Sequence, residues 1–476
     1  MRPLLAARRA ANAPTDTFDR RLTLPLILGS VLNPVNSSMI AVALVPIGTA
    51  FGAPPSQTVW LVSSLYLATA IGQPVVGRLV DRFGPRRLYL FATTLVGVAG
   101  LVGLLAPSLP VLVLARVLLG IGTCAGYPSA MYLIRSESER TGHDSPGSVL
   151  TALSIANQTV AVIGPTIGGL LIDVGGWRSI FAVNVPLSLA CLVLGGIRLP
   201  RRTVLDERAA EHSVRGLDLP GMALFAVMLG ALMAFLMRPS VPHLLLLAIA
   251  VVAAGALTWR ELRTHDPFLD VRVLRGSAAL LATLARQLLA GTTMYAFLYG
   301  YTQWLEDGRG LSASTAGLLL LPMSGVAIVA TLVSGRRGTV WGNLVVAGLL
   351  LVVGDAALLL LGPGTPLAVL VALAVVVGIP QGITSLANQT ALYHQADPTR
   401  MGSSAGLLRT SMYLGAILAS AAVGVFFPHG ADTAGLHGIA LFMVGCGALL
   451  LLVTAFDRSL RRIGPVSRPT TERQHA

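Results

Sequence analysis

An aspartate inside a long apolar run is the residue of this sequence best suited to carry a proton. Asp355 lies in LLVVGDAALLLL, residues 350–361, and is the only one of the 21 acidic residues well inside such a run. Apolar surroundings disfavour an ionised carboxylate, so this carboxyl group can bind and release a proton as its exposure changes. The alternative is structural: Asp355 pairs with an arginine or fills a packing defect.

Three arginines also lie in apolar runs: Arg116 in VLARVLLGIG, Arg409 in AGLLRTSMYLG, and Arg286. A guanidinium there needs acceptors, so Arg116 and Arg409 are predicted to face the interior and to take part in substrate contact or proton coupling. For Arg116 the alternative is a structural arginine bound by carbonyls, and Arg409 could instead pair with Asp355. Arg286, near the end of its run, is predicted to reach the lipid headgroups. Two deep cations and one acid would favour an anionic or amphiphilic substrate.

Uncharged polar side chains interrupt several apolar runs and are candidates to line a substrate cavity. Each could equally join two helices through hydrogen bonds. The candidates are Asn33, Asn36, Gln73, Asn157, Gln158, Gln303, Gln381, Asn388 and Gln389.

The composition is that of a membrane protein with many spans. Of the 476 residues 54% are hydrophobic and 12% are charged, with a mean hydropathy of +0.75, whereas a soluble protein carries about 25% charged residues. Apolar runs long enough to cross a bilayer recur along the chain. The fourteen predicted spans are 22–46, 57–77, 88–107, 109–133, 147–173, 179–198, 217–237, 242–259, 279–303, 313–333, 340–361, 365–390, 404–427 and 435–456.

The positions of the basic residues predict the orientation of these spans. All 34 basic residues are arginines, and with both termini in the cytoplasm only Arg178, Arg238 and Arg309 fall in outer connectors. This is the positive-inside pattern. We therefore expect a multi-pass protein of a bacterial inner membrane that contacts membrane lipid, and the net charge of +13 does not indicate a nucleic-acid partner.

The sequence carries no sign of enzyme, metal or cofactor chemistry. The chain has no lysine, so no phosphate-binding loop that ends in lysine is present, and no His/Cys/carboxylate cluster occurs. The three cysteines all lie in apolar runs and form no paired framework. We expect neither an enzyme nor a metal or cofactor, and we expect a monomer.

The longest polar connectors divide the chain into two groups of six spans with two further spans between them. The predicted parts are a cytosolic tail (1–21), a six-helix bundle (22–198), a cytosolic linker (199–216), two extra helices (217–259), a second cytosolic linker (260–278), a second six-helix bundle (279–456) and a cytosolic tail (457–476). A glycine–arginine turn recurs after the second span of each bundle, as GRLVDRFGPRR and SGRRG.

Two motifs, besides the Arg116 segment VLARVLLGIG, resemble those of the major facilitator superfamily, in particular its fourteen-span drug:proton antiporter branch. The first is the connector Gly77-x-x-x-Asp81-Arg82-x-Gly84, followed by Arg86 and Arg87, with Pro85 where the family usually has a basic residue. The resemblance implies an all-α fold and an inner gate locked by charge pairs and helix-end dipoles. The alternative is a positively charged topology loop.

The second motif is Gly164-Pro165-Thr166-Ile167-Gly168-Gly169, which resembles the antiporter motif of exporters, with Val160 replacing the pattern's first glycine. Its glycines allow close helix crossing and Pro165 bends the helix. The stretches GGWRSIFAVNVP and GLSASTAGLLLLP are also similar to this branch.

The resemblance implies alternating-access export of small amphiphilic molecules, coupled to proton entry and without a partner ATPase subunit. In this branch the first span normally carries an acid, and Asn36 occupies that position in LNPVNSSMIAVALVP. An amide cannot exchange a proton near neutral pH, so the coupling role falls to Asp355. The alternatives are a facilitator or lipid or metabolite exporter without proton coupling, and a transporter-like sensor or scaffold.

Overall fold

The computed structural model describes residues 19, 21–53, 55–58, 60–141, 147–201, 203, 218–237, 241–264, 267–268, 277–311, 313–336, 339–427 and 431–463. Most of both predicted tails and linkers lies outside these residues. Within the described part all regular secondary structure is helical. The expected all-α fold is confirmed.

The N-terminal bundle is built from helices that follow the first six apolar runs. They are α2 (Thr23–Met39), α3 (Leu44–Phe51), α4 (Pro55–Thr58), α5 (Trp60–Phe83), α6 (Pro85–Leu104), α7 (Leu109–Thr123), α8 (Gly126–Thr141), α9 (Gly147–Gly175), α10 (Ser179–Ala182) and α11 (Asn184–Arg198).

Two further helices, α13 (Leu219–Met237) and α14 (Leu244–Arg263), precede the C-terminal bundle. That bundle contains α16 (Ala278–Ala296), α17 (Ala313–Arg336), α18 (Val340–Ala357), α19 (Leu367–Gln395), α20 (Met401–Phe426) and α21 (Thr433–Phe456).

Ten helices among the described residues are long and apolar enough to cross a membrane, and α9 makes an eleventh if its two bent halves form one span. The remaining predicted spans also fold as helix. A 3₁₀ stretch at Ile40–Ala43 interrupts the first, α13 is short, and two π-helical stretches, Phe297–Tyr301 and Trp304–Gly308, extend α16. The count of fourteen spans therefore stays a prediction.

Prolines account for two of the irregularities. Pro165 cannot donate a hydrogen bond to the carbonyl of Ala161, and its ring crowds that turn, so α9 bends by 45° between Ala161 and Ile163. Pro46 likewise leaves the turn before it without one α-helical bond, next to the 3₁₀ stretch Ile40–Ala43. Both irregularities lie where a proline removes a backbone donor.

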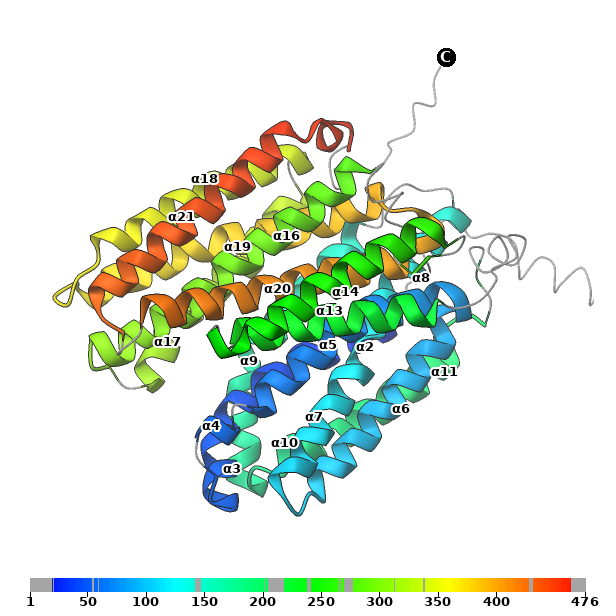
Figure 1. Ribbon diagram of the computed structural model, residues 1–476, viewed down its shortest axis with the longest axis horizontal. Helices are drawn as coiled ribbons and strands as arrows, with labels where there is room; N and C mark the ends of the chain where they lie inside the picture. The colour runs from blue at the N-terminus through cyan, green and yellow to red at the C-terminus, as the bar shows by residue number, and fades with distance from the viewer. Residues whose placement is uncertain are drawn as a thin grey trace, which may run out of the picture.

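The two bundles meet along a seam, and the extra helices lie across it (Figure 1). Phe225 and Met233 of α13 pack in one buried cluster with Ala70 of α5 and Tyr413 of α20. The hairpin α13–α14 therefore contacts both bundles instead of standing apart.

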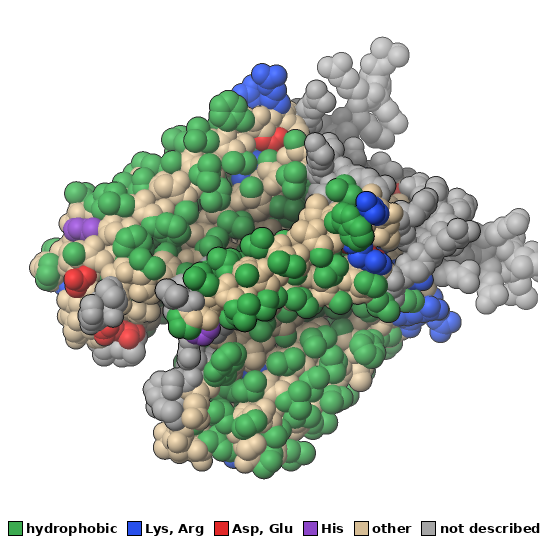
Figure 2. Space-filling view, in the orientation of Figure 1, with side chains coloured by type: hydrophobic (Ala, Val, Ile, Leu, Met, Phe, Trp, Pro, Cys, Tyr) green, Lys and Arg blue, Asp and Glu red, His purple; other side chains and the backbone are tan. Residues whose placement is uncertain are grey.

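The bundles approach each other closely at one end and diverge from it (Figure 1). At that end Gly77 of α5 meets the backbone of Gly402 of α20, and Gly406 meets the backbone of Gln73, with no room for a side chain at either glycine. Blue arginine side chains gather at this end, and several acidic side chains are visible at the far end of the C-terminal bundle (Figure 2). The closed end of the molecule is thus the arginine-rich end.

Candidate functional site

A cavity of about 270 Å³ lies at the seam between the bundles. Helices α2, α5, α8 and α9 form one wall, and helices α16 to α20 form the other. Of the predicted polar residues, the lining includes Asn33, Asn157, Gln158, Gln381, Gln389 and Arg409. The structure therefore brings residues from both halves of the chain to one site.

Asn33 connects helices of both bundles at the cavity wall. Its amide nitrogen donates to the Thr123 hydroxyl at 3.0 Å and to the Thr69 hydroxyl at 3.4 Å, and its oxygen accepts from the Tyr413 hydroxyl at 2.7 Å. Asn33 is buried and lies one residue before Pro34. It is at once a helix–helix contact and a part of the cavity lining.

Arg409 reaches from α20 across the seam to the N-terminal bundle. Its Nη2 donates to Oδ1 of Asn157 at 3.3 Å, and the guanidinium lies over the Tyr127 ring, 4.2 Å from the centroid. Asn157 is held in turn by bonds to Ser30 and to the carbonyl of Leu153. Arg409 has no acidic partner among the described residues, so it does not pair with Asp355.

Gln158 of α9 connects the N-terminal bundle to the C-terminal bundle. Its amide nitrogen donates to Thr331 of α17 at 3.0 Å, and Ser154, one turn away, lies 3.1 Å from Ser385 of α19. Gln381 contacts the Met294 sulfur at 3.4 Å. The bonds of Gln158 and Ser154 cross the seam, and both residues lie in the half of α9 that begins at the arginine-rich end, so they close the cavity toward that end.

Four of the predicted cavity residues lie elsewhere. Gln73 is buried at the closed end, where its backbone meets Gly406. Asn36 is buried and donates to Asn184 of α11 at 2.7 Å, so it joins two helices of one bundle. Gln303 is exposed between the two π-helical stretches. Asn388 is buried behind Gln287, to which it donates at 3.0 Å, and Gln287 lines the cavity in its place.

Arg116 is buried in the N-terminal bundle and does not line the cavity. Its Nε donates to the carbonyl of Leu61 at 2.7 Å, and its Nη1 donates to the carbonyl of Asn36 at 2.9 Å. Both acceptors are backbone carbonyls, which is the contact pattern of a structural arginine. Nη2 has no hydrogen-bond partner among the described residues.

Asp355 is completely buried in α18, outside the cavity lining. Neither carboxyl oxygen has a hydrogen-bond partner within the described part of the chain. The neighbouring Cys446 belongs to α21, so the carboxyl group lies between two helices of one bundle. An unpaired charge is costly in such surroundings.

The carboxylate of Asp81 joins the bundles at the closed end. It accepts from the backbone N–H of Gly402 at 2.7 Å, from the N–H of Ser403 at 2.9 Å and from the Ser403 hydroxyl at 2.5 Å. These N–H groups belong to the first turn of α20, where an anion complements the helix dipole. Asp81 is buried, so water competes little for the bonds.

The other residues of this connector shape the turn between α5 and α6. Gly84 has φ +85°, a conformation that favours glycine, and caps α6 before Pro85. Arg86 donates to the carbonyl of Gly196 at 2.5 Å, and Arg82 lies 5.5 Å from the Phe83 ring. Arg87 is exposed.

The glycines of the second motif pack α9 against the first span. A β-carbon at Gly164 would lie 2.7 Å from that of Ser38, and one at Gly168 would lie 3.1 Å from the carbonyl oxygen of Met39. Gly169 faces open space. The motif therefore allows close approach at two of its three glycines.

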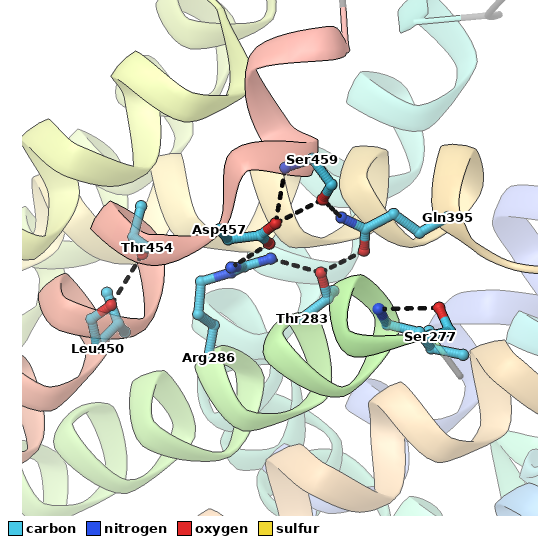
Figure 3. Close-up of polar contacts among 9 residues, drawn as sticks. Ser277, Thr283, Arg286, Gln395, Leu450, Thr454, Asp457 and Ser459 are labelled. Atoms are coloured by element: carbon cyan, nitrogen blue, oxygen red, sulfur yellow. Dashed lines mark hydrogen bonds and ion pairs between the residues drawn. The ribbon is translucent and has the colours of Figure 1, made fainter. Parts of the chain in front are cut away.

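The prediction for Arg286 is wrong. It is fully buried and does not reach the headgroups, because Asp457, just after α21, supplies an anionic partner 2.8 Å away. Arg286 also donates to Thr283, and a ring of bonds continues through Gln395 and Ser459 back to Asp457 (Figure 3). The ring ties α16 and α19 to the segment that follows α21.

Sequence reasoning missed the aromatic part of the cavity. Tyr66, Tyr127, Tyr295 and Tyr413 all contribute to the lining, and the ring centroids of Tyr66 and Tyr413 lie 5.8 Å apart across the seam. Tyrosines in the middle of apolar runs could have indicated these lining residues, because a buried hydroxyl needs a polar partner.

The two helical bundles, the apolar spans and the cavity at the seam define a polytopic membrane protein with a transporter fold. Residues 26–420 match the Major Facilitator Superfamily, and the chain belongs to this family. It is 35% identical over 445 residues to the MFS-type transporter YwoD of Bacillus subtilis (strain 168), covering 89% of this chain and 94% of that protein.

The chain is also similar to a resistance protein and to a solved transporter structure. The chain is 29% identical over 444 residues to the methylenomycin A resistance protein of Streptomyces coelicolor, covering 90% of this chain and 89% of that protein. The solved structure of the proton:xylose symporter XylE aligns with a TM-score of 0.64 at 15% identity, over 91% of this chain and 94% of that one. The latter shows a shared fold alone.

Proposed function

We propose that the protein is a secondary active exporter that moves small amphiphilic molecules out of a bacterial cell by alternating access. The observation that carries this proposal is the cavity at the seam, lined from both bundles and closed at one end by Asp81 and Gln158. Rocking of one bundle against the other would expose such a cavity to each side in turn. Relatives named as resistance proteins support the direction of transport.

The orientation is part of the proposal. With the arginine-rich end in the cytoplasm, both termini are cytoplasmic, the chain crosses a bacterial inner membrane fourteen times, and the structure represents the outward-open state. The contacts of Asp81 with α20 then form the closed inner gate. Gly164 and Gly168 would hold α9 on the first span while the bundles move. We expect the monomer to be the working unit.

Proton coupling rests on Asp355. Its carboxyl group is buried and has no hydrogen-bond partner among the described residues. A group that binds and releases a proton during transport is expected in such surroundings in one of the two transport states. Arg116 and Arg409 are the cations that could respond to it within the membrane. Two observations favour the uncoupled alternative, a facilitator or lipid or metabolite exporter: Asp355 lies outside the cavity, and Asn36 occupies the usual acid position.

The test is transport in a reconstituted system. Purified protein in liposomes is expected to move substrates from an efflux panel when a pH gradient is imposed, and Asp355→Asn is expected to abolish the dependence on that gradient. Transport that is unaffected by the gradient would support the uncoupled alternative. Absence of transport in liposomes for every compound of the panel, together with absence of efflux from pump-deficient cells, would leave only the sensor or scaffold alternative.

A further inference from the structure

The charge of the cavity is the feature that restricts the substrate further. Among the described residues that line it, Arg409 is the single charged side chain, and the lining contains no aspartate, glutamate or histidine. The other polar groups are amides and hydroxyls. The cavity therefore carries one positive charge and no compensating acid.

The other buried charges do not neutralise Arg409. Arg286 is paired with Asp457 in the C-terminal bundle. Asp355 lies outside the cavity lining, and the bonds of Arg116 go to backbone carbonyls. Arg116 acts electrostatically on Tyr66 and so adds to the positive potential, while Arg409 is the charged group that lines the cavity itself.

The guanidinium of Arg409 is held in place but not saturated. A guanidinium has five N–H donors, and the partners found here are one neutral amide oxygen at 3.3 Å and the face of the Tyr127 ring. Its planar fork matches a carboxylate, which accepts two parallel bonds. The ring of Tyr127 covers the guanidinium from one side, and both residues belong to the cavity lining.

The remaining walls suit a flat apolar body. Tyr66 and Tyr295 supply aromatic faces, and Met294, Met323 and Met412 supply adaptable apolar surface. An aromatic ring attached to a carboxylate could contact these walls while its charged end meets Arg409. A cation in the same position would meet the guanidinium without an acid to offset it.

We propose that the substrate is an amphiphilic organic anion, with a carboxylate bound by Arg409 and an aromatic or otherwise apolar body against the tyrosines and methionines. This inference rests on the proposed export function and names its substrate class. Bound at Arg409, the anion competes with Asn157, whose bond to Arg409 crosses the seam. Substrate binding thereby weakens one contact between the bundles.

The experiment compares three probes of one shape: 2-naphthoate, 2-naphthamide and 2-naphthylmethylammonium. Binding to the purified full-length protein in detergent is measured by equilibrium dialysis. Because charge-assisted bidentate bonds are about twice as strong as neutral ones, we expect 2-naphthoate to bind about tenfold more tightly than the amide, with the cation the weakest. Arg409→Gln is expected to abolish the preference for the anion.

Two further variants keep the result interpretable. Arg458→Gln removes one arginine from an exposed position outside the cavity, so it should leave the preference intact. Asn157→Asp leaves Arg409 in place but puts a carboxylate at the atom that Arg409 already contacts, and should abolish the preference even if Arg409→Gln fails to fold.

Equal binding of the three probes, a preference for the cation, a preference that survives both cavity variants, or no binding of any probe at about 1 mM would overturn the inference. The liposome transport test separates the two proposals. Transport of neutral or cationic compounds alone would overturn the substrate class and leave the exporter function standing. Anion binding without transport of any compound would overturn the exporter function and leave the anion preference of the cavity standing.

Discussion

The guanidinium of Arg286 and the carboxylate of Asp457 form a buried ion pair with an N–O distance of 2.8 Å, although 171 residues separate them in the chain. The Asp457 carboxylate also accepts from the backbone N–H and the hydroxyl of Ser459, which orient it toward α16. The segment after α21 is thereby fastened to the rest of the C-terminal bundle.

We expect Arg286→Met to destabilise the protein by about 3–5 kcal/mol, because it leaves the Asp457 charge buried without its cation. The measurement is thermal unfolding of purified protein in detergent. Arg458→Gln, an exposed arginine next to Asp457, is the matched control and should change the melting temperature little. Arg286→Met/Asp457→Leu should recover part of the loss, and a double variant as unstable as the sum of both single changes would contradict the pairing.

Asp81 is expected to bias the equilibrium between the two states of the transporter. Asp81→Asn removes the anionic acceptor from the N-terminus of α20 and with it about 1–2 kcal/mol of charge-assisted capping. Spin labels at Phe83 and Arg458, on the arginine-rich end of each bundle, should then report a larger share of long distances. The same labels should show no change for Asp397→Asn, whose carboxylate bonds only to Thr399 of its own turn in the described structure.

The positions of the helices were predictable from the sequence, whereas many of their contacts were not. Each apolar run folds as helix because a lipid-facing backbone must satisfy its own hydrogen bonds. The pairing of Asp81 with Ser403 joins residues 322 apart, and no local pattern specifies it. The motif indicated a gate, but only the fold shows that the acceptor meets the first turn of α20.

Arg286 and Asn36 show why the candidate site was only partly predictable. Arg286 lies near the end of its run, and depth along one helix does not reveal a partner supplied by a segment beyond α21. Asn36 and Asn33 lie one turn apart in α2, yet only Asn33 lines the cavity, since α11 meets the helix at Asn36. Which side chain lines a cavity depends on the neighbouring helix, which composition does not disclose.

The glycines of the α9 motif offer a matched pair of substitutions. We expect Gly164→Ala to lower the melting temperature, because the new methyl group would lie 2.7 Å from the Ser38 β-carbon and force α9 away from α2. Gly169→Ala meets open space and should raise helix stability by up to about 1 kcal/mol. Thermal unfolding in detergent compares the two. Equal effects would show that close packing at Gly164 does not hold the helices together.

Asp355 and Asp457 are both buried acids, but among the described residues only Asp457 of the two has an ion-pair partner. Asp457→Asn should destabilise the protein, since Arg286 would keep a buried charge without its counterion. Asp355→Asn should leave the melting temperature nearly unchanged, because that carboxyl group has no partner to lose in the described structure. A large loss of stability for Asp355→Asn would point to a structural role and count against Asp355 as a proton carrier. An unchanged melting temperature together with lost dependence of transport on the pH gradient would place proton exchange at this residue, since the amide keeps the shape of the carboxyl group and removes only its titration.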